Sequence, residues 1–158
     1  YDEGEINRSG EKKNMVYSII TEERIETPPS YLIYGGLLFE PLTSNYMTVA
    51  IEDLFLVYGK EENYKEYDQL VVLVRVLPFD VNLGYSDVVN EVILKVNGEK
   101  YKDFKDFAQK VKNVKTEFIV FENDKGHEIV LDVKEVEEQK EELLGNYNIT
   151  SEMSDDIK

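Results

Sequence analysis

The segment Tyr31-Leu-Ile-Tyr-Gly35-Gly36-Leu37-Leu38-Phe39-Glu-Pro-Leu-Thr43 interrupts an apolar, aromatic run with a pair of glycines. The run resumes directly after the pair, which predicts a strand that follows a loop with unusual backbone angles. Glycine adopts positive φ at little cost, so paired glycines can point successive N–H groups into one concavity that holds a carboxylate. The alternative is a tight turn that lets two backbones pack closely, and the segment taken alone favours this alternative.

The composition limits the classes of function. The chain has 158 residues, 42% of them hydrophobic, and this suits one domain with a real core. Its 33 acidic and 18 basic side chains give a net charge of -15, which repels a nucleic-acid backbone. It contains no cysteine, so it has no disulfide, no thiolate zinc site and no cysteine nucleophile.

No segment of the sequence predicts a membrane span or a signal peptide. The longest apolar run, Leu70 to Leu77, contains Arg75 and is too short to cross a bilayer. The chain begins at Tyr1 without an initiator methionine, so we expect it to be a piece of a longer protein.

The first part of the chain predicts few regular elements. Residues 1–14 are polar and indicate a flexible lead-in, and residues 15–20 form a plausible strand. Thr43 or Ser44 can cap a helix that ends at Gly59. The charged stretch from Lys60 to Asp68 is best taken as a solvated loop. The apolar positions that define this helix are Met47, Ala50, Ile51, Leu54 and Phe55.

The middle of the chain is better organised. Gln69 to Leu77 predicts a strand buried on both faces, and Glu91 to Val96 predicts a second one that ends at Asn97-Gly98. Asp103 can cap the helix that follows. The apolar face of this helix contains Phe104, Phe107, Ala108 and Val111.

The last part predicts two antiparallel strands, 117–122 and 128–133, around the turn Asn123 to Gly126. A charged helix from Glu135 to Leu144 follows, with Gly145 as its C-terminal cap. This order of elements predicts an α+β fold, mainly β: a small, partly open antiparallel β-barrel flanked by helices.

The run Gly84-Tyr85, residues 92–98 and the helix with Phe104, Phe107 and Val111 resemble a PDZ domain in the circular order of Deg/HtrA serine proteases. More narrowly, several segments resemble the second, C-terminal PDZ domain of plant-type Deg proteases. The resemblance covers residues 15–158 and implies a PDZ-like domain at 15–134, with an insertion at about 44–68, and a helical extension at 135–158 packed on the domain. The segments that resemble plant-type Deg proteases are 28–31, 36–39, 41–43, 82–85 and 151–158.

The resemblance implies a carboxylate-binding loop and a peptide groove. Two positions depart from the usual pattern: Leu38 replaces the second glycine of Gly-Leu-Gly-Phe, and Phe104 or Asp103 lies where many PDZ domains place a ligand-reading histidine. The implied loop and groove residues are Gly35, Gly36, Leu37, Leu38, Phe39, Phe104, Phe107, Ala108 and Val111.

Neither catalysis nor metal binding is expected of this chain. It lacks a Gly-x-Ser-Gly-Gly loop, and its one histidine, His127, lies in a predicted hairpin without a serine or carboxylate partner. Asn123-Asp124 and Asp155-Asp156 lack the spacing of a calcium loop, so we expect no metal and no cofactor. The resemblance implies that the parent protein is an ATP-independent serine endopeptidase.

Three classes of function remain after this comparison. The first is a non-catalytic regulatory and assembly module of a Deg/HtrA-type endopeptidase in protein quality control, in contact with the parent protease domain and sibling subunits. The second is a module that captures unfolded or C-terminal peptides as an added strand along Leu37 to Glu40. The third is a stand-alone enzyme, for which we find no catalytic group. We choose the first, in an undetermined compartment, with an intracellular or organellar one favoured.

Aromatic residues of the inserted segment are candidate contacts for this assembly role, because tyrosine and phenylalanine are enriched at interfaces. The alternative is that they only cover the core. The candidates are Tyr46, Phe55, Tyr58, Tyr64 and Tyr67.

Overall fold

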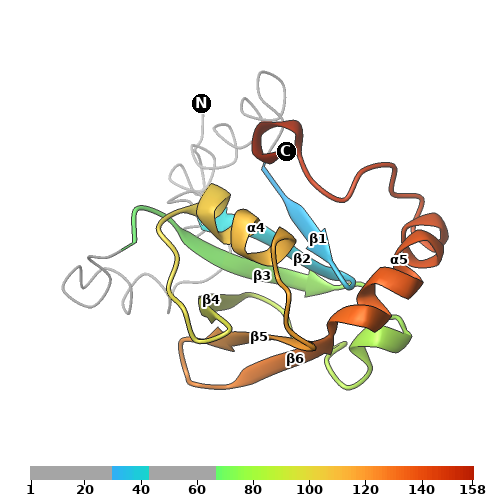
Figure 1. The fold of residues 1–158 in the computed structure, drawn as a ribbon, viewed down its shortest axis with the longest axis horizontal. Coiled ribbons are helices and arrows are strands. Elements are labelled where there is room, and N and C mark those ends of the chain that lie inside the picture. The colour runs from blue at the N-terminus through green and yellow to red at the C-terminus, as the bar shows by residue number, and fades with distance from the viewer. Residues whose placement is uncertain (1–29, 43–66) are drawn as a thin grey trace, which may run out of the picture. The chain divides into compact units, whose positions relative to one another are not determined.

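Six strands form one sheet in which each strand lies beside the next one in the chain (Figure 1). The structure, a computed structural model, describes residues 30–42 and 67–158. Because β1 and β6 end the strand order, the sheet is open, and this confirms the predicted α+β, mainly β class with a partly open antiparallel sheet. The strands are β1 (Leu32–Tyr34), β2 (Leu37–Leu42), β3 (Leu70–Val76), β4 (Glu91–Val96), β5 (Phe118–Asn123) and β6 (Glu128–Asp132).

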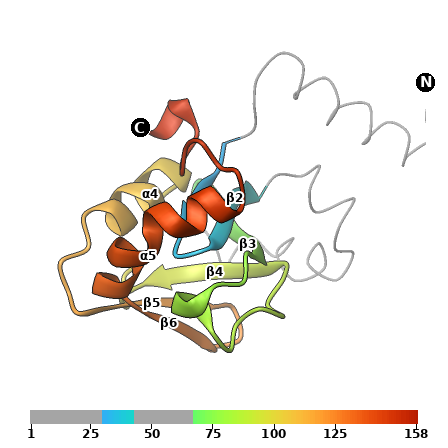
Figure 2. The same ribbon diagram turned by 90° about the vertical axis from the view of Figure 1, so that its right-hand side faces the viewer.

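Two α-helices lie on the same side of the sheet (Figure 2). These are α4 (Phe104–Lys112) and α5 (Val133–Asn146), and the described residues also form two short 3-10 helices, η2 (Asp80–Asn82) and η3 (Asp155–Ile157). One hydrophobic core lies between the helices and the sheet. It includes Val136 and Leu143 of α5 and Ile157 of η3, so the C-terminal residues contribute to the core of the domain.

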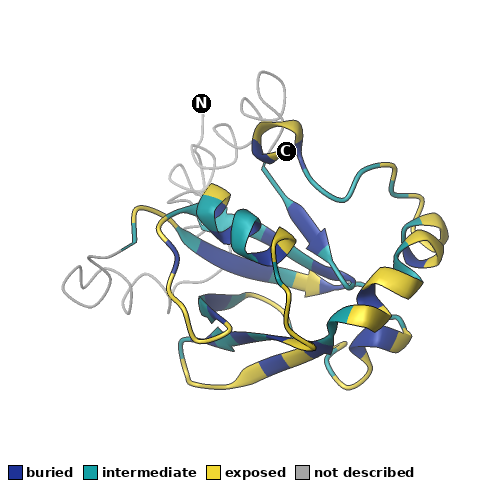
Figure 3. Ribbon diagram, viewed as in Figure 1, coloured by how far each residue is buried: buried dark blue, intermediate teal, exposed yellow. Residues whose placement is uncertain are grey.

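Aromatic rings fill the centre of this core. The ring of Phe39 lies 5.0 Å from that of Phe107 on α4 and 4.9 Å from that of Phe121 on β5, measured between centroids. Phe107 also packs edge-on against Tyr101 at 5.3 Å. Such edge-on and tilted contacts add to the stability from area burial. The buried residues alternate along β5 and β6, which leaves one face of this hairpin exposed (Figure 3).

The predicted apolar face and cap of α4 are confirmed. Phe104, Phe107, Ala108 and Val111 are all buried. The Asp103 carboxylate accepts a hydrogen bond of 2.8 Å from the backbone N–H of Asp106. This bond satisfies one of the donors that a helix leaves unpaired at its N-terminus.

The prediction for α5 was wrong at both ends. The helix begins at Val133, because the carboxylate of Asp132 accepts hydrogen bonds from the N–H groups of Lys134 and Glu135 and caps it. Gly145 lies inside the helix and is not the C-terminal cap. The left-handed residue that follows the helix is Asn148, with φ of 56°.

The predicted turns of the described part are confirmed. Asn97 and Gly98 both have positive φ after β4, and Gly126 has positive φ in the turn between β5 and β6. The predicted lead-in, the strand at 15–20 and the inserted helix lie outside the described residues, as does the inserted loop up to residue 66.

Candidate functional site: the Gly35-Gly36 turn and the cavity beside β1

Gly35 and Gly36 form the two-residue turn that joins β1 to β2. Both have positive φ, 58° and 85°, as the hairpin turns that match strand twist require. Tyr34 and Leu37 form the pair that closes the hairpin. The tight-turn alternative of the sequence analysis therefore describes this loop.

The turn also needs glycine because other backbones and side chains lie against it. A Cβ atom on Gly36 would lie 2.6 Å from the carbonyl oxygen of Leu77 and would also clash with the side-chain amide of Asn82. A Cβ atom on Gly35 would lie 2.7 Å from the Leu131 side chain. The Gly36 carbonyl in turn accepts a hydrogen bond of 2.7 Å from the N–H of Leu77. The glycines thus anchor the hairpin to the end of β3.

Both edges of β2 have a neighbouring strand of this chain. β1 lies along one edge, with Ile33 opposite Leu38 and Leu32 opposite Phe39, and β3 lies along the other. A peptide that adds as a strand needs an unpaired edge. A peptide can therefore pair with Leu37 to Glu40 only if β1 first separates from β2. Peptide binding along this strand stays a prediction.

The C-terminal segment pairs with the outer edge of β1. The N–H of Ile33 donates to the carbonyl of Glu152 at 2.6 Å, and the N–H of Ser154 donates to the carbonyl of Tyr31 at 3.0 Å. Three residues further on, Ile157 is buried in the core. The tail is therefore held by strand-like bonds and by an apolar anchor.

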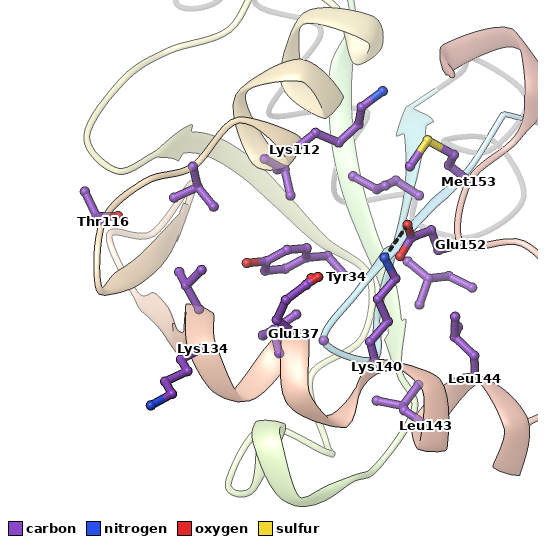
Figure 4. Close-up of a pocket in the computed structure, with 18 of the residues that line it drawn as sticks. Tyr34, Lys112, Thr116, Lys134, Glu137, Lys140, Leu143, Leu144, Glu152 and Met153 are labelled. Atoms are coloured by element: carbon purple, nitrogen blue, oxygen red, sulfur yellow. Dashed lines mark ion pairs between the residues drawn. The ribbon is translucent and has the colours of Figure 1, made fainter.

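A cavity of about 580 Å³ lies between β1, the end of α4, α5 and this tail (Figure 4). One ion pair crosses its wall: Lys140 Nζ of α5 lies 2.9 Å from a carboxylate oxygen of Glu152. The hydrogen bond to Glu152 raises the pKa of Lys140 above its usual value. Apolar residues that line the cavity are Leu32, Ile33, Val111, Val136, Leu143 and Met153.

Tyr34 lies in the middle of this cavity, near Glu137 of α5 (Figure 4). Burial, and to a smaller extent the negative charge of Glu137, raises the pKa of the Tyr34 phenol to about 12. The phenol is therefore a neutral hydrogen-bonding group at physiological pH. An apolar wall with a few polar groups is the usual character of a ligand pocket.

The sequence comparisons identify the family of this chain. A family model described as a PDZ domain matches residues 20–156, which is most of the chain. The chain belongs to the PDZ domain family. The match assigns residues 20–156 to a PDZ domain and none of them to a catalytic domain.

Relatives of this PDZ domain are plant proteases. Protease Do-like 2, chloroplastic, of Arabidopsis thaliana is 29% identical over 96% of this chain and 27% of the relative. Putative protease Do-like 3, mitochondrial, of the same plant is 29% identical over 89% of this chain and 25% of the relative. Protease Do-like 4, mitochondrial, also of Arabidopsis thaliana, is 31% identical over 78% of this chain and 22% of the relative. The chain thus spans about a quarter of the length of these relatives.

The structure separates the predicted groove residues of the PDZ domain into three groups. Gly35, Gly36 and Val111 line the cavity. Leu38 is partly buried opposite Ile33. The remaining candidates are buried in the core: Leu37, Phe39, Phe104, Phe107 and Ala108.

Tyr67 is the one candidate interface residue that the structure describes. Its ring packs 5.0 Å from that of Tyr101, and its hydroxyl donates to the carbonyl of Leu94 at 2.7 Å. This arrangement matches the alternative in which the aromatic side chain covers the core. Tyr46, Phe55, Tyr58 and Tyr64 lie outside the described residues.

Sequence reasoning missed most of the polar groups of the cavity. Tyr34, Glu137, Lys140 and Glu152 come from three segments, and no local pattern connects them. The available signal was the segment 151–158, which the sequence analysis used only for the family resemblance.

His127 is exposed beside the turn between β5 and β6, where its backbone N–H donates to the side-chain oxygen of Asn123 at 2.8 Å. Within residues 30–42 and 67–158, histidine, aspartate and glutamate form no cluster of three that suits a metal ion. No helix in the same ranges has the length and hydropathy of a membrane span.

Proposed function

We propose that this chain is the second PDZ domain of a Deg/HtrA-type serine endopeptidase and has a non-catalytic role in assembly and regulation. Its partners in this role are the parent protease domain and sibling subunits of a homo-oligomer. The parent acts without ATP in protein quality control. The protease names of the Arabidopsis relatives support the parent class, and the quoted plant-type segments support the position of the domain.

The observation that carries the assembly role is the pairing of β2 on both edges. PDZ domains that capture peptides do so by adding a strand to an exposed sheet edge. In this chain, β1 takes the place beside Leu37, Leu38 and Phe39 that an added strand needs. The edge of β1 is in turn covered in part by the tail at Glu152 and Ser154. A domain built this way is better suited to permanent contacts than to exchange of peptides.

The cavity beside β1 supports peptide capture as a second candidate function. Its volume of about 580 Å³ lies in the range of small ligand sites, and its wall is largely apolar. In this alternative, an unfolded or C-terminal peptide either displaces β1 or inserts a side chain next to Tyr34.

A disulfide between β1 and β2 separates the two functions. Ile33 and Leu38 face each other directly, and a two-residue turn makes theirs the non-hydrogen-bonded type of pair, in which side chains lie closest. The chain has no cysteine of its own, so the double variant Ile33→Cys with Leu38→Cys forms one defined bond. The reduced form of the same variant is the matched control, and each single variant controls for the substitutions.

The assembly role predicts that C-terminal peptides from a library do not bind at low-micromolar concentration to either form. If such peptides bind and C-terminal amidation weakens the binding, peptide capture is the function. Binding that oxidation abolishes then means that the peptide displaces β1, and binding that survives oxidation means that the peptide inserts a side chain next to Tyr34. Removal of residues 20–156 from the full-length protein should change its oligomer size in sedimentation. An unchanged oligomer with unchanged regulation would end the assembly proposal.

A further inference from the structure

Exposed apolar side chains lie in one loop of the domain and on the hairpin that is hydrogen-bonded to it. Among the described residues, the large apolar side chains with the greatest exposure are Leu83 (76%), Val89, Phe118 (45%), Val130 (38%) and Tyr147. Leu83 and Val89 lie in the loop 78–90 between β3 and β4, and Phe118 and Val130 lie on the β5–β6 hairpin. Large apolar groups that cluster on a surface mark interaction sites more often than single ones do.

Hydrogen bonds hold these segments together. The N–H of Val130 donates to the hydroxyl oxygen of Tyr85 at 3.2 Å, which places the loop beside β6. The hydroxyl of Tyr147, just after α5, donates to the carbonyl of Pro78 at 2.7 Å, at the start of the same loop. The apolar residues therefore belong to one ordered region.

The hairpin has an apolar centre on its outward face. Buried residues alternate along both strands with Phe118, Val120 and Val130, and Val120 lies directly opposite Val130. These three residues therefore share the face that is turned away from the core. On a sheet with one solvated face, that face normally carries polar side chains. We name Phe118, Val120 and Val130 the hairpin surface.

Acidic side chains frame the hairpin surface. Asp132 lies opposite Phe118, and Glu122 lies opposite Glu128, next to the pair of valines. The hairpin 117–132 contains five acidic residues and one lysine, and the loop 78–90 contains two acidic residues and no basic one. Lys95 of β4 lies opposite Glu122, so the acidic residues outnumber the basic ones here without excluding them. A partner that covers this surface must therefore bring positive charge around its apolar contact. A second copy would bring the same acidic frame, on a chain whose charge is -15.

Strand addition is not the mode of contact here, although β6 is an edge strand. The outward N–H of Val130 is already bonded to Tyr85, and Asp132 ends the strand by capping α5. Natural edge strands are shortened and covered in this way to prevent pairing. Contacts at the hairpin surface must be made by side chains on its face.

We propose that the hairpin surface docks another protein through a patch of apolar residues framed by lysine or arginine. This proposal does not depend on the cavity beside β1 or on the class of the parent protein. Phe118 and Val130 supply the apolar contact, and Glu122, Glu128 and Asp132 select the charge of the partner.

The test uses the whole chain and two designed cyclic hairpin peptides. One peptide displays three valines framed by four lysines, and the other has glutamates in place of the lysines. Amide chemical shifts of the ¹⁵N-labelled chain locate the binding site. We expect the lysine peptide to shift residues 83–85, 118–122 and 128–132, and the glutamate peptide to shift none of them.

Matched variants separate this contact from general charge attraction. Phe118→Ser should weaken binding of the lysine peptide about tenfold. Glu128→Gln should weaken it severalfold, whereas Glu138→Gln, at an exposed site on α5, should not. Amide spectra of each variant check that it is folded.

Three results would overturn the proposal. Equal binding of both peptides would remove the charge argument. Equal effects of Glu128→Gln and Glu138→Gln, with shifts spread along α5, would mean that the peptide senses only net charge. Self-association of the chain that Phe118→Ser abolishes would make the surface a contact between copies.

Discussion

The side-chain amide nitrogen of Asn82 donates a hydrogen bond of 2.9 Å to the carbonyl oxygen of Gly35, 47 residues earlier in the chain. The same nitrogen donates to the carbonyl of Leu77 at 2.9 Å, and its oxygen accepts from the N–H of Phe79 at 3.0 Å. One buried side chain thus joins the β1–β2 turn, the end of β3 and the loop that follows.

Asn82→Ala should lower the free energy of unfolding by about 2–4 kcal/mol, because it leaves buried carbonyl and N–H groups without partners. Urea denaturation measures the change. Asn146→Ala, at an exposed position of α5, is the control and should stay within about 0.5 kcal/mol of wild type. A loss at Asn82 no larger than at Asn146 would contradict this account of the turn.

Gly36→Ala and Gly84→Ala separate close packing from backbone strain. Both glycines have positive φ, but a Cβ atom on Gly84 meets no atom within 4 Å. Gly84→Ala should cost about 1–2 kcal/mol from strain alone. Gly36→Ala adds a clash with the Leu77 carbonyl and should cost about 3–5 kcal/mol. Equal losses by thermal or urea unfolding would show that packing at the turn is unimportant.

Ile157→Ala should release the C-terminal tail from β1. The side chain is 3% exposed, so its loss removes most of the apolar anchor of the tail. Hydrogen exchange at the N–H groups of Ile33 and Ser154, which bond across this contact, should accelerate about thirtyfold or more. Lys158→Ala is the control, and protection that is the same in both variants would mean that the tail is held elsewhere.

The stability of the domain should depend on Tyr34 at high pH. Its pKa is raised from 10.0 to about 12, so folding favours the neutral phenol. This contribution is fully present below pH 10 and is lost as the pH rises through about 12. Between pH 9 and pH 11, the free energy of unfolding should therefore fall less in Tyr34→Phe than in wild type. Equal slopes would contradict the assignment.

Glu137→Gln tests the cause of that shift. The variant removes the smaller contribution, a negative charge near the phenol, and retains burial. The pKa of Tyr34, followed by the NMR shift of its ¹³C-labelled ring against pH and assigned with Tyr34→Phe, should decrease but stay above 10. A pKa that returns to 10 would mean that charge, and not burial, dominates.

Local sequence patterns determined the parts of the fold that depend on nearby residues. Side chains close in sequence determine the apolar face of α4, its Asp103 cap and the bounds of β4. The end of α5 could not be predicted from the local sequence, because either Gly145 or Asn148 can adopt the conformation that ends a helix. The N–H of Tyr147 still donates to the carbonyl of Leu143 at 3.2 Å, so the helix continues past Gly145.

The tertiary structure alone decided the use of the Gly35-Gly36 pair. Glycines with positive φ can form either a carboxylate cradle or a hairpin turn, and the local sequence is the same in both cases. The choice depends on contacts with Asn82, Leu77 and Leu131, which are more than 40 residues away. The cavity depends on longer separations still, because Glu152 and Ser154 reach β1 from the other end of the chain. The side-chain pattern of a segment limits which helix, strand or turn the segment can form. Which segment pairs with the edge of a strand depends on contacts across the whole folded chain.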